Sequence, residues 1–260
     1  MNTTDSNSLQ PASAPVPFEV VVTDDGSYTA RIGAGETMHS MRGALGETVY
    51  IYGSAFERIY EILRAETKTP RILSLGLGLG FVEIVAAAVA VKFQTHLSGE
   101  SFELDPRLIE SFKNWVSSGA EIPGHIPHMA YDKSLEMTAT AYDLSPAAIQ
   151  EKLKHALGDG TWILSGPLLP DTFRDRPIER RGFNAVAFDA FSSKSTPELW
   201  TREFLDPFLK EACDSNCVLS TYACTGHLKR ALVDAGFTLE IREGFASKRD
   251  STLACRTTLI

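Results

Sequence analysis

Three glycines at alternate positions, Gly76, Gly78 and Gly80, follow a short apolar run and precede a longer one. Because glycine has no Cβ atom, such a run lets the chain turn sharply and brings its backbone close to a ligand. A helix that starts after the turn directs its free N–H groups toward that ligand. The pattern therefore predicts a strand, a nucleotide-binding turn and a helix between residues 71 and 91.

The spacing of these glycines indicates which nucleotide would bind. The dinucleotide fingerprint is Gly-x-Gly-x-x-Gly, but the third glycine of this chain comes one residue earlier, and Phe81 occupies the expected place. Gly-x-Gly-x-Gly is typical of enzymes that use S-adenosylmethionine. The alternative is a tight turn that binds nothing. An acidic residue about 20 positions further on, placed to hold ribose hydroxyl groups, would favour the nucleotide.

Acidic residues occur at the required distance and also later in the chain. Glu103 is the predicted ribose ligand, because it lies where the next strand should end. Asp105 precedes Pro106, and we expect it to cap the following helix. Asp189 ends another apolar run. Ligands in such sheets bind outside the carboxyl ends of the strands, so Asp189 is the candidate catalytic residue, with loop capping as its alternative role.

A parallel sheet would bring these residues together. Strands are predicted at 71–76, 95–104, 161–165, 183–188 and 217–222, and two closing strands at 237–241 and 252–257. Helices predicted between the strands indicate a doubly wound α/β fold. The closing antiparallel hairpin indicates a seven-stranded, Rossmann-like methyltransferase sheet rather than a dehydrogenase half-domain.

The rest of the chain is predicted as follows. Residues 1–17 are mostly small and polar, and we expect a disordered tail ahead of one domain at 18–260. Strands at 18–23 and 28–32 flank a turn sequence and form a small N-terminal β extension.

Two later segments are less regular in sequence. The segment 37–48 is interpreted as a loop, and Ser54 as the N-cap of an amphipathic helix at 54–66. Residues 119–144 are interpreted as an irregular insertion.

Composition and charge limit the classes of protein to which this chain can belong. The chain has 260 residues and a net charge of −8, which disfavours nucleic-acid binding over the whole surface. It has neither a secretory signal nor an apolar run long enough to span a bilayer, so we expect a cytoplasmic protein. Its four cysteines are expected as reduced thiols. The alternative, a zinc site at Cys213 and Cys217, needs a second pair of ligands that the sequence does not supply, so no metal is expected.

The stretch from Phe188 to Trp200, which reads FDAFSSKSTPELW, resembles a signature of the MnmC-type tRNA methyltransferase domain. Further similar positions are His39-Ser40, Gly43-Ala44, Glu47, residues 101–103 and 235–237, Gly244-Phe245 and Lys248-Arg249. The resemblance runs in order over roughly residues 18–255.

The resemblance implies methyl transfer from S-adenosylmethionine to the amine of 5-aminomethyl-(2-thio)uridine at the tRNA wobble position. Gly76, Gly78, Gly80 and Glu103 would then bind the cofactor, and Asp189 would orient the amine and accept its proton. His39, Lys248 and Arg249 would bind the substrate. In many bacteria this domain is fused to an FAD-dependent oxidase. This chain has no second glycine fingerprint, so we expect another enzyme to supply the aminomethyl-uridine tRNA.

Two departures from the family pattern leave alternatives open. The family usually has Gly-Asp after strand three, where this chain has Gly166-Pro167, with Asp171 as a candidate replacement for the adenine contact. The family's Asp-Gly-Phe is Asp189-Ala190-Phe191 here, which adds a methyl group near the site. The alternatives are methyl transfer to another amine or small molecule, and a non-catalytic nucleotide- or RNA-binding module.

Overall fold

The computed structural model describes residues 17–33, 35–169, 171–173, 176–177, 181–190, 196–245 and 251–258. Lys248 and Arg249 lie outside these ranges, and so does the tail predicted at the N-terminus, apart from residue 17.

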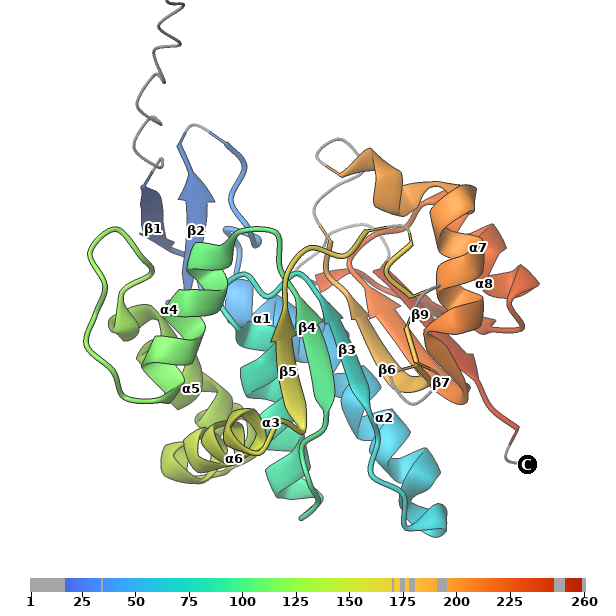
Figure 1. The fold of residues 1–260 in the computed structure, drawn as a ribbon, viewed down its shortest axis with the longest axis horizontal. Helices are drawn as coiled ribbons and strands as arrows, with labels where there is room; N and C mark the ends of the chain where they lie inside the picture. Colours follow the sequence, from blue (N-terminus) through green and yellow to red (C-terminus); the bar gives the residue numbers. More distant parts are fainter. Residues whose placement is uncertain are drawn as a thin grey trace, which may run out of the picture.

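The described chain is built on one seven-stranded sheet with the order β5-β4-β3-β6-β7-β9-β8 (Figure 1). Its strands are β3 (Ile72–Leu75), β4 (Gly99–Phe102), β5 (Trp162–Ser165), β6 (Phe183–Phe188), β7 (Cys213–Thr221), β8 (Thr238–Arg242) and β9 (Ser251–Arg256). The first five are parallel, and β9 runs antiparallel to β7 and β8. The predicted doubly wound sheet with a closing antiparallel hairpin is confirmed. Strand order reverses between β3 and β6, so their carboxyl ends form the point at which such sheets bind ligands.

Helices cover both faces of this sheet. They are α1 (Ala44–Thr48), α2 (Ser54–Leu63), α3 (Phe81–Lys92), α4 (Pro106–Val116), α5 (His128–Tyr142), α6 (Pro146–Gly158), α7 (Arg202–Glu211) and α8 (Gly226–Asp234). Figure 1 shows α7 and α8 together, away from α5 and α6. Successive residues of β3 alternate between two hydrophobic clusters: Ile72 packs with α2 and α3, whereas Leu73 and Leu75 pack with α7 and α8.

Helix α3 follows the glycine turn and is apolar on all sides. Its first ten residues, Phe81 to Ala90, are buried, because α5 and α6 pack over it on the side away from the sheet. An evenly apolar helix is stable only in such an interior position. Helix α3 therefore fixes the end of the glycine turn against the core.

The N-terminal strands β1 (Phe18–Val22) and β2 (Tyr28–Ile32) form a separate antiparallel pair, as predicted (Figure 1). In the described part of the chain, no helix has both the length and the apolar character needed to cross a membrane.

Three predictions about local structure were wrong. The segment interpreted as a loop contains α1, which continues through a π-helical turn, Val49–Gly53, into α2. Ser54 is therefore not an N-cap; its hydroxyl donates to the Tyr50 carbonyl at 2.9 Å. The segment interpreted as an irregular insertion contains α5, whose buried positions include Ser134 and Thr138. These small polar residues conceal the helical spacing of its buried face.

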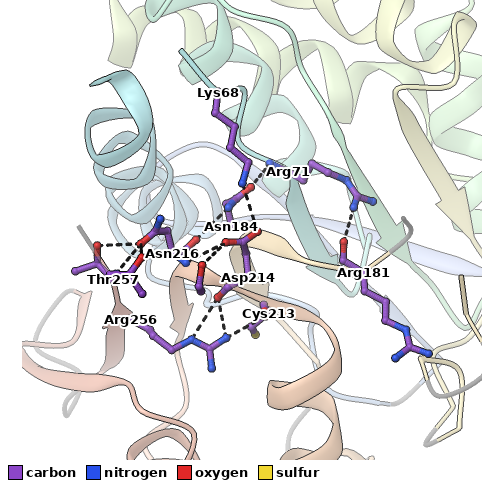
Figure 2. A network of polar contacts seen from close by, with 11 residues as sticks. Lys68, Arg71, Arg181, Asn184, Cys213, Asp214, Asn216, Arg256 and Thr257 are labelled. Atoms are coloured by element: carbon purple, nitrogen blue, oxygen red, sulfur yellow. Dashed lines mark hydrogen bonds and ion pairs between the residues drawn. The ribbon is translucent and has the colours of Figure 1, made fainter. Parts of the chain in front are cut away.

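A polar network fixes the beginnings of β6 and β7, at the end of the sheet away from the glycine turn (Figure 2). Asn184 accepts from the Arg71 backbone N–H at 3.1 Å and donates to the Asn216 carbonyl at 3.0 Å. Arg256 donates to the carbonyl oxygens of Cys213 and Asp214 at 3.0 and 2.7 Å. The β6–β7 register is irregular just after Phe183. The network therefore supplies side-chain partners where the ladder between these strands is interrupted.

Candidate active site

The carboxyl ends of β3 and β6 border a cavity of about 230 Å³. Of the predicted site residues, Gly76, Gly78, Glu103, Asp189 and His39 line it. The cavity is completed by α1, the π-helical turn and the loop after β2. The sheet topology therefore brings together Gly76, Glu103 and Asp189, which lie far apart in the sequence.

The three glycines have different reasons for lacking a side chain. Gly76 has φ +95°, and a Cβ added there would lie 2.7 Å from the backbone oxygen of Asp189. A Cβ at Gly80, where φ is +67°, would overlap the ring of Phe112. At Gly78 the nearest atom to an added Cβ is Cε1 of His39, at 3.6 Å. Gly76 and Gly80 thus allow close packing. Gly78 has φ +50° and, like Gly76, lines the cavity, where the missing side chain leaves room for a ligand.

Glu103 connects the end of β4 to the glycine turn. Its Oε2 accepts from the Gly78 N–H at 3.0 Å, and its Oε1 accepts from the Asp105 N–H at 2.9 Å. Burial raises the pKa of Glu103 above its ordinary value, and these backbone N–H groups offset part of that rise. Each carboxylate oxygen has a second lone pair. Glu103 can therefore still accept hydrogen bonds from a pair of ribose hydroxyl groups.

A second, mainly apolar cavity adjoins the first and shares Gly76, Glu103 and Ala190 with it. Leu104, Pro167, Leu168 and Leu199 are among its lining residues. An apolar slot beside a ribose-binding carboxylate suits the flat faces of a nucleobase. Sequence reasoning missed these apolar residues, although a leucine between the acidic residues Glu103 and Asp105, beside the predicted strand end, was a signal that could have found Leu104.

Asp171, the candidate replacement for the adenine contact, is exposed and lies outside the lining of this second cavity. Asp105 caps α4, as predicted, because its Oδ1 accepts from the Arg107 N–H at 3.0 Å. Asp105 also pairs with the Arg107 guanidinium at 2.6 Å, and this partner lowers the pKa of the Asp105 carboxyl. It lies outside the lining of both cavities.

Two tyrosines that sequence reasoning missed form hydrogen bonds with Asp189 and with the residue that follows it. The Tyr52 hydroxyl donates to Oδ1 of Asp189 at 2.7 Å. The Tyr222 hydroxyl donates to the carbonyl of the next residue, Ala190, at 2.7 Å. Burial, and then the Asp189 charge, raise the pKa of Tyr52 well above its ordinary value, so Tyr52 stays protonated and acts as a donor.

His39 covers the glycine turn. Its ring lies 4.6 Å from the Phe81 ring, measured between centroids, and its backbone N–H donates to the Thr29 hydroxyl at 3.0 Å. Its Nδ1 lies 3.3 Å from the same hydroxyl. This position puts His39 against the turn predicted to bind the cofactor. The two other predicted substrate-binding residues, Lys248 and Arg249, lie outside the described residues.

The chain is similar to several known proteins. Residues 173–257 match the model of a family described as S-adenosyl-L-methionine-dependent methyltransferase. A protein of Methanocaldococcus jannaschii is 27% identical over 90% of this chain, which spans 58% of that relative. The tRNA 5-methylaminomethyl-2-thiouridine biosynthesis bifunctional protein MnmC of Vibrio vulnificus is 27% identical over 50% of this chain and 20% of its own length.

Among solved structures, the crystal structure of MnmC2 from Aquifex aeolicus has the same fold. Its TM-score is 0.63 at 23% identity, and the match covers 94% of this chain and 71% of that chain. The comparisons confirm the predicted resemblance, the S-adenosylmethionine-dependent methyltransferase class and the cofactor. The chain spans less than two thirds of the length of these curated relatives.

Proposed function

We propose that this S-adenosylmethionine-dependent methyltransferase, which resembles the MnmC-type domain, methylates the amine of 5-aminomethyl-(2-thio)uridine at the tRNA wobble position. The observation that carries the proposal is the placement of Asp189 in one cavity with Gly78 and Glu103. The relatives that are named for 5-methylaminomethyl-2-thiouridine biosynthesis support the choice of substrate. An enzyme that uncovers this amine on tRNA must act before the methyl transfer.

The residues present fit the cofactor. When bound, S-adenosylmethionine supplies an electrophilic methyl group. Gly76 and Gly78 would leave room for it, Glu103 would accept hydrogen bonds from its ribose, and Leu104 with Pro167 would contact its base. Holding the amine in line with the methyl group supplies most of the catalysis, because alignment removes a large entropic cost.

Asp189 would handle the proton of the acceptor amine. A primary alkylamine has a pKa of about 10.4, so most of it is protonated at neutral pH. A nearby carboxylate favours the protonated form. Asp189 is therefore assigned to orient the amine and to accept its proton, and it does not lower the pKa of that amine.

Nucleoside mass spectrometry of tRNA from a strain that lacks the gene tests this function. The methylated nucleoside should disappear and its unmethylated amine should accumulate. The wild-type gene should restore the modification, and an Asp189→Ala gene should not. An unchanged nucleoside profile in the deletion strain would contradict the proposed substrate.

Methyl transfer to another amine is the second candidate, and Ala190 favours it. This residue stands where the family usually has glycine, is 5% exposed and lines both cavities. Its methyl group therefore reduces the space at the acceptor end of the site. The purified chain can be incubated with tRNA that carries the unmethylated aminomethyl group and, separately, with free amines. Methylation of the tRNA supports the proposed function, and methylation of a free amine supports the second candidate.

Glu103→Ala is expected to weaken S-adenosylmethionine binding by roughly tenfold or more, about 1.4 kcal/mol. The change removes the proposed ribose acceptor and also the acceptor for the Gly78 and Asp105 N–H groups. Isothermal titration calorimetry measures the Kd. Asp105→Asn is the matched control, which keeps an oxygen to cap α4, loses the ion pair with Arg107 and should leave Kd unchanged. Unchanged affinity in folded Glu103→Ala would remove the assignment.

A further inference from the structure

Tyr52 belongs to the π-helical turn Val49–Gly53, which connects α1 to α2 without a break. A π-helical turn is wider than an α-helical turn and occurs frequently at functional sites. Here the widened turn places a buried tyrosine at the bottom of the cavity, where it is 2% exposed.

Side chains from the far half of the sheet hold this turn. Ser220 on β7 donates to the Ile51 carbonyl at 2.7 Å. Arg242 on β8 donates to the same carbonyl at 3.3 Å and also to the Tyr50 carbonyl. Because the two carbonyls that precede Tyr52 are tied to the sheet, the backbone that carries Tyr52 has little freedom to move relative to the sheet.

The opposite side of the turn is equally constrained. A Cβ added at Gly53 would overlap the Tyr142 hydroxyl of α5 and would lie 3.2 Å from Cγ1 of Val85 on α3. The turn is thus held between α3 and α5 on one side and the sheet on the other. A rigid donor in this position can define the orientation of its acceptor.

We propose that Tyr52 is the positioning residue for Asp189: its hydroxyl, 2.7 Å from Oδ1, fixes the rotation of the carboxylate and stabilises its charged form. A hydrogen bond to a charged acceptor is roughly twice as strong as one between neutral groups. This inference rests on the proposed function, because it assigns Tyr52 a role in the proton transfer given to Asp189.

Other titratable groups also face the cavity around Asp189. They are His39 from the loop after β2, Glu47 from α1, Glu103 from the end of β4 and Tyr222 from the end of β7. Tyr52→Phe leaves all of them in place. A change in the titration of Asp189 in this variant therefore reports the lost hydroxyl.

Tyr52→Phe is expected to reduce kcat by about tenfold and to leave the Kd for S-adenosylmethionine within about twofold of wild type. The acid limb of the kcat/KM profile should move to higher pH, because the carboxylate has lost a donor. Tyr50→Phe is the matched control. It removes a hydroxyl from the same turn, and that hydroxyl donates to the Glu243 carbonyl at 3.0 Å, so the kinetics should stay at wild type.

A double variant tests whether Tyr52 acts through Asp189. Tyr52→Phe combined with Asp189→Ala should be no slower than Asp189→Ala alone, because no acceptor is left for Tyr52 to position, and a further tenfold loss would overturn the proposal. The titration of the ¹³C-labelled Asp189 carboxyl needs no substrate and should move to higher pH in Tyr52→Phe. An unmoved titration would overturn the positioning role even if the tRNA substrate proved wrong. Inactivity of the wild type toward tRNA would count against the proposed function alone.

Discussion

Asp189→Asn and Asp189→Ala are each expected to slow methyl transfer by about 100-fold, a usual size for a positioned acid–base group. Both should bind S-adenosylmethionine within about twofold of wild type, because the cofactor contacts assigned to Gly78 and Glu103 remain. Asn keeps the size of the side chain and an oxygen that can accept from Tyr52. It cannot accept the proton of the acceptor amine, so the loss measures that function.

The pH dependence separates proton acceptance from orientation. As pH rises toward the pKa of the free amine, about 10.4, more of the substrate is already neutral and needs no acceptor. Asp189→Asn should therefore recover part of its rate at high pH, and Asp189→Ala, which cannot orient the amine, should recover less. Single-turnover rates across pH measure this difference. Full activity of Asp189→Asn at neutral pH would leave Asp189 with a positioning role only.

The sheet could be predicted from the sequence because its local signals agree with one another. Short apolar runs alternate with helical segments, and parallel strands joined by right-handed crossovers permit few arrangements. The glycine spacing marks the turn after β3, and the end of each run marks the edge where Glu103 and Asp189 must lie. The position of Glu103 could be predicted because the acidic residue that holds the ribose lies about 20 residues after the glycine turn, one helix and one strand further along the chain.

The contacts within the site could not be predicted in this way. Tyr52 and Asp189 are 137 positions apart, and their hydrogen bond depends on how the π-helical turn packs against the sheet. A π-helical turn breaks the 3.6-residue period that sequence reasoning uses, and the predicted helix therefore begins only at Ser54, after Tyr52. Similarly, the apolar slot of Leu104, Pro167 and Leu199 comes from three separate segments of the chain, and no local pattern joins them.

Two buried glutamates, Glu83 and Glu100, differ in whether a positively charged side chain lies beside them, and the sequence alone does not distinguish them. Glu100 on β4 pairs with the Arg176 guanidinium at 2.6 Å. Glu83, in the first turn of α3, accepts from the Ser101 hydroxyl at 2.7 Å, and this hydroxyl in turn accepts from Nε1 of Trp162 at 2.8 Å. Burial raises the pKa of Glu83 to about 7, and the bond from Ser101 offsets part of the rise.

Glu83→Gln is therefore expected to stabilise the protein at pH 8 by about 3 kcal/mol and to change its stability little near pH 4.5. Below pH 4.5 Glu83 is protonated in both states and resembles glutamine. Between pH 4.5 and about 7 the unfolded chain loses this proton and the folded chain keeps it, so the wild type loses stability as pH rises. Above about 7 the loss is complete.

Urea unfolding of both proteins across this range measures the difference. Glu100→Gln is the contrasting control and should destabilise the protein at pH 8, because it leaves Arg176 without its carboxylate. An equal effect of Glu83→Gln at pH 5 and pH 8 would show that Glu83 is ionised throughout, with its charge stabilised by the surrounding hydroxyl groups.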